Sequence, residues 1–113
     1  MRDKLEIFDN LVFYEGAVED LLKLDKTLQK EALKQLWKIN INPFAGRELG
    51  NRMGMNLTGY RKIYFHQKKY RIVWQALADG RALILQVWGI GPREKAEIYR
   101  LIMKRAQECV IIK

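Results

Sequence analysis

Residues able to bind an anion or to transfer a proton are concentrated between Gly59 and Trp74. They lie in two segments in which polar and apolar residues alternate, joined by a basic turn. The alternation is that of β-strands, whose successive side chains point to opposite faces. One face then collects Lys62, Tyr64 and His66 from the first segment and Arg71, Val73 and Gln75 from the second. The opposite face collects Ile63, Phe65, Tyr70, Ile72 and Trp74. The sequence therefore predicts a hairpin with an apolar face for a core and a cationic face for an anion.

Cations and tyrosines are the functional groups that this sequence offers for chemistry. Arg71 and Arg93 can stabilise the charge of a phosphorane, because a guanidinium presents a fork of N–H donors. Lys62 can act as a point charge, or exchange a proton where neighbouring cations favour its neutral form. Tyr64 and Tyr99 can stack on bases or pass protons. This set favours metal-free attack of an RNA 2′-hydroxyl on its own 3′ phosphate, since the substrate supplies the nucleophile.

The sequence leaves the general base of such a reaction open. His66 is the one histidine of the chain, and histidine is the side chain that exchanges protons near neutral pH. Each candidate also has a structural interpretation. Arg71 and Arg93 could pair with Glu97 and other acids. Tyr99 could pack against the core, and His66 could be an exposed residue near the hairpin tip.

Positive charge is concentrated in the second half of the chain. Residues 1–56 contain nine Lys/Arg and nine Asp/Glu, whereas residues 57–113 contain twelve and four, so 12 − 4 = +8 is the whole net charge. Such asymmetry favours a polyanionic partner: nucleic acid first, then an acidic protein or a membrane surface. A solvated surface would have the same composition. The residues expected to contact RNA are Tyr64, Lys68 and Lys69 at the hairpin and Arg47 and Arg52 before it.

Several reaction classes lack the residues that they need. One histidine excludes an acid–base pair of two histidines, and no Cys/His set has the spacing of a zinc site. The four acids of the second half do not form the carboxylate cluster that Mg²⁺ requires. Pro92 interrupts the one glycine-rich segment that resembles a phosphate loop. The sequence therefore predicts no metal and no cofactor.

Cysteine content and hydropathy bear on where the protein acts. Cys109 is the only cysteine, so no internal disulfide can form and a reducing compartment is expected. The opening residues lack the pattern of a signal peptide. No run approaches the roughly 20 apolar residues of a membrane span. We therefore expect a soluble cytoplasmic protein that forms a single domain over residues 1–113.

The first half of the chain is expected to form a strand and two helices. The strand is predicted at Leu11–Tyr14, the first helix from Gly16, and the second from Asp25, which suits an N-cap. Pro43 ends the second helix, because the residue before a proline is disfavoured in helical conformation. The four glycines within Asn42–Gly59 predict a loop.

Three strands and a last helix complete the predicted fold. The strands are expected at 60–66, 69–77 and Ala82–Trp88, with a hairpin turn at Asp79-Gly80, and Pro92 is expected to begin the final helix. The fold class is α+β: an N-terminal strand, a helical hairpin, a three-stranded antiparallel meander and a C-terminal helix. The residues expected in the core include Trp37, Trp74 and Trp88. The residues expected on a solvated helix face are Lys26, Lys30, Lys34 and Lys38.

The sequence resembles the RelE/ParE superfamily of bacterial type II toxins in the strand Tyr70–Trp74, the junction GPREKAEIY and the preceding strand–helix–helix order. The resemblance covers nearly the whole chain. Its most specific features are the mid-strand Arg71, and Arg93 followed six residues later by Tyr99. The Asn-Pro after the second helix and the segment Leu57–Tyr60 are also similar.

This resemblance implies a small endoribonuclease that cleaves messenger RNA in the ribosomal A site, leaving a 2′,3′-cyclic phosphate and a 5′-hydroxyl. It also implies an antitoxin that wraps and silences the protein. By the same resemblance, Arg71 matches the arginine that stabilises the transition state, and Arg93 the arginine near the leaving group. Tyr99 matches the tyrosine that stacks on the substrate base and aids proton transfer.

The chain departs from the family at one position and leaves two other functions open. Lys62 matches the first of two strand lysines, but Tyr64 occupies the place of the second, which makes His66 the substitute base to test. The ParE branch shares the fold, poisons DNA gyrase and generally lacks the catalytic cluster. Retention of that cluster favours the ribonuclease. A third interpretation is a binding module for RNA or an acidic peptide.

Overall fold

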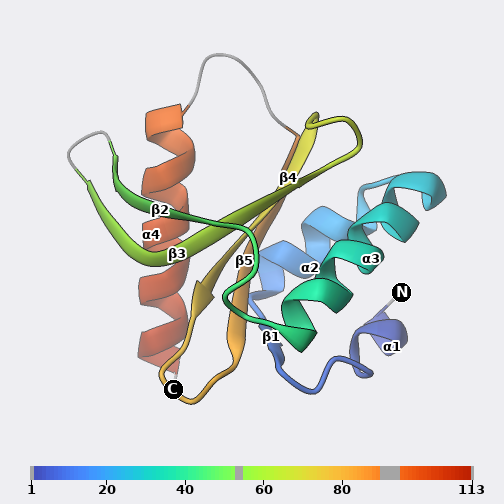
Figure 1. Ribbon diagram of the computed structural model, residues 1–113, viewed down its shortest axis with the longest axis horizontal. Coiled ribbons are helices and arrows are strands. Elements are labelled where there is room, and N and C mark those ends of the chain that lie inside the picture. The colour runs from blue at the N-terminus through green and yellow to red at the C-terminus, as the bar shows by residue number, and fades with distance from the viewer. Residues whose placement is uncertain (1, 53–54, 90–94, 113) are drawn as a thin grey trace.

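A five-stranded sheet crosses the centre of the molecule, with helices against both of its faces (Figure 1). The computed structural model describes residues 2–52, 55–89 and 95–112, and at 2, 51–52, 55–56, 88–89, 95–99 and 109–112 it describes the backbone alone. In chain order the elements are α1 (Arg2–Leu5), β1 (Leu11–Phe13), α2 (Glu15–Leu22), α3 (Lys26–Ile41), β2 (Arg47–Arg52), β3 (Met55–Phe65), β4 (Tyr70–Ala76), β5 (Ala82–Gly89) and α4 (Lys95–Ile112). The strand order is β1-β5-β4-β3-β2; β1 runs parallel to β5, and the other neighbouring pairs are antiparallel.

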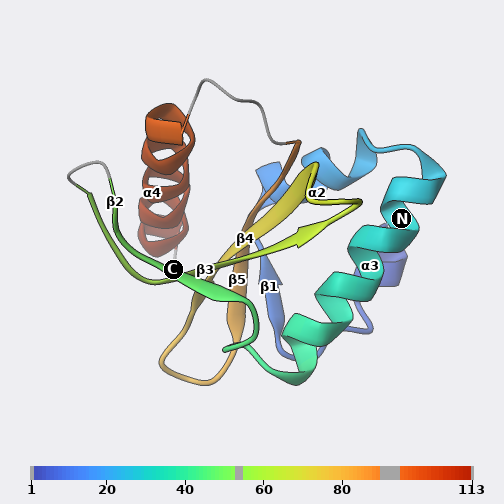
Figure 2. The same ribbon diagram turned by 45° about the horizontal axis from the view of Figure 1, so that its top comes forward.

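The two faces of the sheet carry separate parts of the core (Figure 2). Trp74 and Ile84 pack with α2 and α3, where Leu36 is fully buried. Val73 of β4 packs on the other side with Ile102 of α4. Because helices cover both faces, β5 is almost wholly apolar, and its predicted place inside the sheet is confirmed.

β3 and β4 form the predicted hairpin. The residues that lie opposite each other include Lys62 with Val73 and Tyr64 with Arg71. This register places Lys62, Tyr64 and Arg71 on one face of the sheet, as the alternation predicts. The turn after β4 is also confirmed: Gly80 has a φ of 89°, a left-handed conformation that glycine adopts at no steric cost.

The helical hairpin begins and ends close to the predicted positions. Asp25 is the N-cap of α3, and its carboxylate accepts a hydrogen bond from the backbone N–H of Leu28 at 2.9 Å. This bond satisfies one of the donors that the first turn of a helix leaves without an intrahelical partner. The helix ends at Ile41, and Asn42 before Pro43 has an extended conformation.

The predicted loop over Asn42–Gly59 is wrong in part, because β2 lies within it. Arg47–Arg52 pairs with β3, which extends from Met55 rather than from residue 60. The glycine-rich sequence is accommodated by a register shift between Glu48 and Gly50. The antiparallel meander therefore has four strands instead of three, within the same α+β class.

The predicted burial of the tryptophans is correct for one residue and wrong for another. Trp74 is fully buried, and its indole N–H donates to the carbonyl of Pro43 at 2.8 Å. Trp37 is exposed, because Leu36 and Ile39 occupy the side of α3 that faces the sheet. The side chain of Trp88 and the whole of Pro92 lie outside the described residues. The lysine row of α3 is exposed, as predicted.

A largely buried ion pair joins α4 to the rest of the fold. Arg105 Nη1 lies 3.2 Å from Asp20 Oδ2 of α2 and donates to the carbonyl of Leu85 at 2.7 Å. The same carboxylate oxygen accepts from the backbone N–H of Val87 at 3.1 Å. The pair thus also bonds two backbone groups of β5, close to the register shift between β4 and β5.

None of the helices in the described ranges carries an apolar stretch long enough to cross a bilayer.

Gly46→Ala is expected to lower the free energy of unfolding by about 2–5 kcal/mol, of which about 1–2 is left-handed strain and about 1–3 is overpacking. Gly46 has a φ of 71°, and a Cβ there would lie 2.3 Å from the carbonyl oxygen of Lys62 and 2.9 Å from the Trp74 ring. Gly59→Ala is the matched control, because its φ is 88° but its Cβ would meet no atom within 4 Å. Urea unfolding measures both. Equal losses would show that the contact with Lys62 costs nothing.

Candidate functional site

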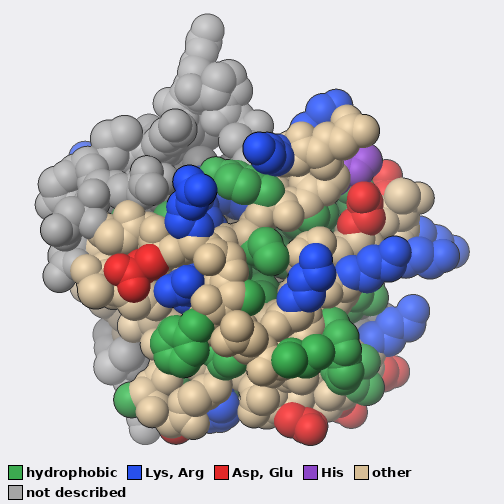
Figure 3. All heavy atoms as spheres, viewed as in Figure 1, with side chains coloured by type: hydrophobic (Ala, Val, Ile, Leu, Met, Phe, Trp, Pro, Cys, Tyr) green, Lys and Arg blue, Asp and Glu red, His purple; other side chains and the backbone are tan. Residues whose placement is uncertain are grey.

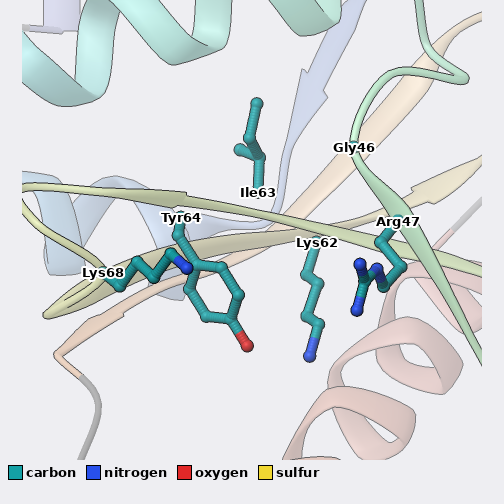
Figure 4. A pocket seen from close by; sticks show the side chains of 6 residues that line it. All are labelled: Gly46, Arg47, Lys62, Ile63, Tyr64 and Lys68. Atoms are coloured by element: carbon teal, nitrogen blue, oxygen red, sulfur yellow. The ribbon is translucent and has the colours of Figure 1, made fainter.

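A cleft of about 390 Å³ opens over β2, β3 and the turn that follows β3 (Figure 4). The residues that line it are Gly46, Arg47, Lys62, Ile63, Tyr64 and Lys68. The side chains of Arg47, Lys62 and Tyr64 point to the same side of the sheet, whereas Ile63 points to the other side (Figure 4). The cleft therefore lies on the predicted cationic face.

The sheet register sets the spacing of these groups. Arg47 of β2 lies opposite Lys62 of β3, and Tyr64 of β3 lies opposite Arg71 of β4. Directly opposed residues on antiparallel strands have Cβ atoms about 4.5–5.5 Å apart. Three cations and one phenol from three adjacent strands therefore lie as neighbours on one face of the sheet, and all of them except Arg71 line the cleft.

Burial makes this cluster electrostatically effective. Lys62 and Arg71 are buried, and the Lys62 ammonium lies 5.1 Å from the centre of the Tyr64 ring, at cation–π distance. Tyr64 itself is exposed and accessible to a ligand. Charges act more strongly on a ligand in a partly desolvated site than in water. Among the described lining residues there is no carboxylate, so the cleft favours an anion.

A second tyrosine borders this face. Tyr60 precedes Lys62 by two residues on β3 and packs in the core under α4. Burial raises the pKa of the Tyr60 phenol above its usual value. Tyr60 therefore stays protonated at physiological pH, and it adds no negative charge to the cationic face.

The turn after β3 has an unusual backbone that places Lys68 beside the cleft. His66, Gln67 and Lys68 are consecutive non-glycine residues with φ of 53°, 56° and 65°. Each left-handed residue costs about 1–2 kcal/mol relative to an extended one. The conformation turns Lys68 towards Tyr64 (Figure 4). The next residue, Lys69, is exposed.

The predicted placement of His66 on the cationic face is wrong. Its imidazole Nδ1 lies 2.8 Å from Glu31 Oε2 of α3, and its ring lies 5.9 Å from that of Tyr70. α3 packs on the opposite face of the sheet from α4, and Tyr70 packs with that same layer. Because His66 lies in the turn and not in β3, the strand alternation does not extend to it.

Three predicted site residues fall partly or wholly outside the described structure. Arg93 lies outside the described residues, and only the backbone is described for Tyr99 in α4 and for Arg52 in β2. Two residues had no functional prediction: Gly46 at the cleft, whose missing side chain lets β2 approach Lys62, and Glu31 on the other face of the sheet, the partner of His66. The left-handed turn that directs His66 to Glu31 has no signal in the sequence.

Known proteins of Escherichia coli resemble this chain in sequence and in fold. No family model matches the chain. A protein of Escherichia coli named as a RelE-like toxin is 29% identical over 93 residues, which are 82% of this chain and 92% of that protein. The free E. coli toxin RelE, solved as a double arginine-to-alanine mutant, is 27% identical, with 84% of this chain and 94% of that one covered and a TM-score of 0.60. The toxin–antitoxin complex RelBE of E. coli matches at 26% identity, with 74% and 96% covered and a TM-score of 0.57.

Proposed function

Because the chain is RelE-like in both sequence and fold, we propose that it is the toxin of a type II toxin–antitoxin system and cleaves messenger RNA in the ribosomal A site without a metal. One observation carries the proposal: Lys62, Tyr64 and Arg71 lie together on one sheet face, and Lys62 and Tyr64 line a cleft without a carboxylate among its described lining residues. This cluster suits a reaction in which charge develops on a phosphate.

The proposed reaction uses the RNA's own nucleophile. The 2′-oxygen bonds to the adjacent phosphorus while the bond from phosphorus to O5′ breaks. The 2′-hydroxyl proton passes to a general base, and O5′ leaves with a proton from a general acid. The products are a 2′,3′-cyclic phosphate and a 5′-hydroxyl, so no water is consumed in this step.

Each residue of the cluster has a proposed part in this step. Arg71 donates to the non-bridging oxygens, whose negative charge is greatest in the phosphorane. Lys62 adds a second positive charge beside the exposed Tyr64 ring. From the family resemblance it is also a candidate base. Tyr64 is proposed to stack on a base next to the scissile phosphate. From the family resemblance, Arg93 is proposed at the leaving group and Tyr99 in proton transfer.

The residues around the cluster are proposed to hold the RNA backbone. Arg47, Lys68 and Lys69 supply positive charge on both sides of Tyr64, and Arg52 follows on β2. Such contacts give affinity that falls steeply with salt concentration. The proposed partners are therefore messenger RNA and the ribosome, in the cytoplasm. A cognate antitoxin is also proposed, since RelE has been solved with its antitoxin RelB.

Primer extension on a defined message in a purified translation system tests the proposal. We expect cuts within codons that require both the protein and the ribosome. If the message stays intact while the protein still arrests growth, DNA gyrase becomes the candidate target, and supercoiling assays would test it. Intact message without growth arrest would leave a binding module.

His66→Gln is expected to leave the cleavage rate within about threefold of the native rate, whereas loss of a general base costs about 10²–10⁴-fold. The imidazole contacts Glu31 on the far layer and not the cleft residues. Glu31→Ala removes the same contact from the other side and is the matched control. Single-turnover cleavage measures both. A large loss of cleavage rate in His66→Gln alone would identify His66 as the general base and would contradict its placement away from the cleft.

A further inference from the structure

The outer side of α3 carries large apolar side chains that neither the core nor the cleft uses. Ile41 is 69% exposed, Phe44 just beyond the helix is 62% exposed, and Trp37 is 46% exposed. Helical residues advance by about 100° each, so Ile41 lies about 180° from the fully buried Ala32, on the side directed away from the sheet. A surface helix normally places polar residues there.

One edge of this apolar surface is held in place by packing. The Trp37 ring contacts Phe8, with ring centres 5.7 Å apart, so it presents a fixed face to solvent. Trp37 and Ile41 are four residues apart and therefore neighbours on the helix. We call Trp37, Ile41 and Phe44 the α3 apolar face. Figure 3 shows hydrophobic side chains gathered over the end of α3, with lysine side chains beside them.

Lysines flank the α3 apolar face on the same outer side of the helix. Lys34 and Lys38 lie three residues before Trp37 and Ile41, respectively, which makes each a surface neighbour. The one acid of α3, Glu31, is bonded to His66. Within the described residues, no ion pair engages these lysines. The surface therefore combines exposed apolar side chains with positive charge that α3 does not neutralise.

We propose that the α3 apolar face is a docking surface for an acidic amphipathic helix of the antitoxin, a partner that rests on the proposed function. Apolar side chains spaced three and four residues apart on that helix would cover Trp37, Ile41 and Phe44. Flanking Asp or Glu would meet Lys34 and Lys38. RNA bases could stack on Trp37 and Phe44, but RNA offers no apolar group to cover the aliphatic Ile41, so an apolar helix fits this surface better.

The proposed surface is separate from the cleft. α3 packs on the layer that contains Trp74, whereas Lys62 and Tyr64 lie on the other face of the sheet. A helix on α3 therefore holds the toxin without contacting the catalytic residues. Substitutions in the α3 apolar face should change binding and leave RNA cleavage within about twofold.

The probe is a labelled amphipathic peptide of about four helical turns, with leucines three and four residues apart and glutamates on both flanks. Fluorescence anisotropy with the full chain measures its dissociation constant. We expect at least tenfold weaker binding for Ile41→Ser and for Lys38→Glu, and weaker binding as salt is raised. Leu22→Ser is the matched control, because Leu22 is an exposed apolar residue of α2 outside this surface. A peptide with lysines in place of glutamates should not bind.

Three results would overturn the docking proposal: no binding of the acidic peptide, equal binding of the two peptides, or an equal loss in Leu22→Ser. Self-association of the protein that Ile41→Ser abolishes would assign the surface to a second copy instead. Weaker binding of a labelled RNA to Ile41→Ser would assign it to RNA. The translation assay reports the proposed function independently, so failure of cleavage and failure of docking are distinguishable.

Discussion

Arg71→Met is expected to slow RNA cleavage by about 10²–10³-fold, the usual cost of removing one donor that stabilises transition-state charge. Arg71 lies opposite Tyr64 on the sheet face that carries the cleft. Its side chain is shielded from water, so water screens its charge only weakly. Methionine keeps most of the length of the side chain and removes the fork and the charge. Single-turnover cleavage of a ribosome-bound message measures the rate, and circular dichroism checks that the variant is folded.

Two further variants separate geometry from charge. Arg71→Lys keeps the charge but loses the forked donors, so we expect an intermediate rate. Arg81→Met also removes one positive charge, but from the exposed β4–β5 turn, where Arg81 pairs with Asp79. It should cleave at nearly the native rate. If Arg81→Met and Arg71→Met lost activity equally, net charge and not the position of Arg71 would explain the effect.

Arg105→Met is expected to lower the free energy of unfolding by about 3–5 kcal/mol, because it leaves a buried carboxylate without its cation. The side chains of Arg105 and Asp20 are only 13% and 11% exposed. The substitution also removes the donor to the Leu85 carbonyl, which loosens α4 from β5. Urea unfolding should show a midpoint at a lower urea concentration than for the native protein.

A double-mutant cycle identifies the cause. Asp20→Asn combined with Arg105→Met should be less destabilising than the sum of the two single changes, because no charge is then left buried alone. The exposed pair of Arg81 and Asp79 supplies the contrast, since such pairs contribute about 0–1 kcal/mol. If Arg105→Met lowered the free energy of unfolding as little as Arg81→Met, the ion pair of Arg105 and Asp20 would not stabilise the fold as proposed.

Local patterns were sufficient to predict the parts of the fold that depend on nearest neighbours. The period-two alternation of β3 and β4 put Lys62, Tyr64 and Arg71 on one face, and the sheet register confirms it. Asp25 was recognised as an N-cap and Asp79-Gly80 as a turn, because both depend on a few adjacent residues. The cationic face was predictable for the same reason.

Tertiary structure decided what depends on residues far apart in the chain. β2 contains Gly50 and Asn51 and has no strand pattern of its own. Pairing with β3 nevertheless makes it a strand and brings Arg47 opposite Lys62. Because of the way α3 packs on the sheet, Leu36 and Ile39 are buried in the core and Trp37 is exposed. Three left-handed residues turned His66 away from the cleft to Glu31, because a turn does not continue the alternation of a strand. No local sequence pattern encodes the hydrogen bonding and packing between distant segments. These long-range interactions therefore determine which of the candidate functional residues lie together at the cleft.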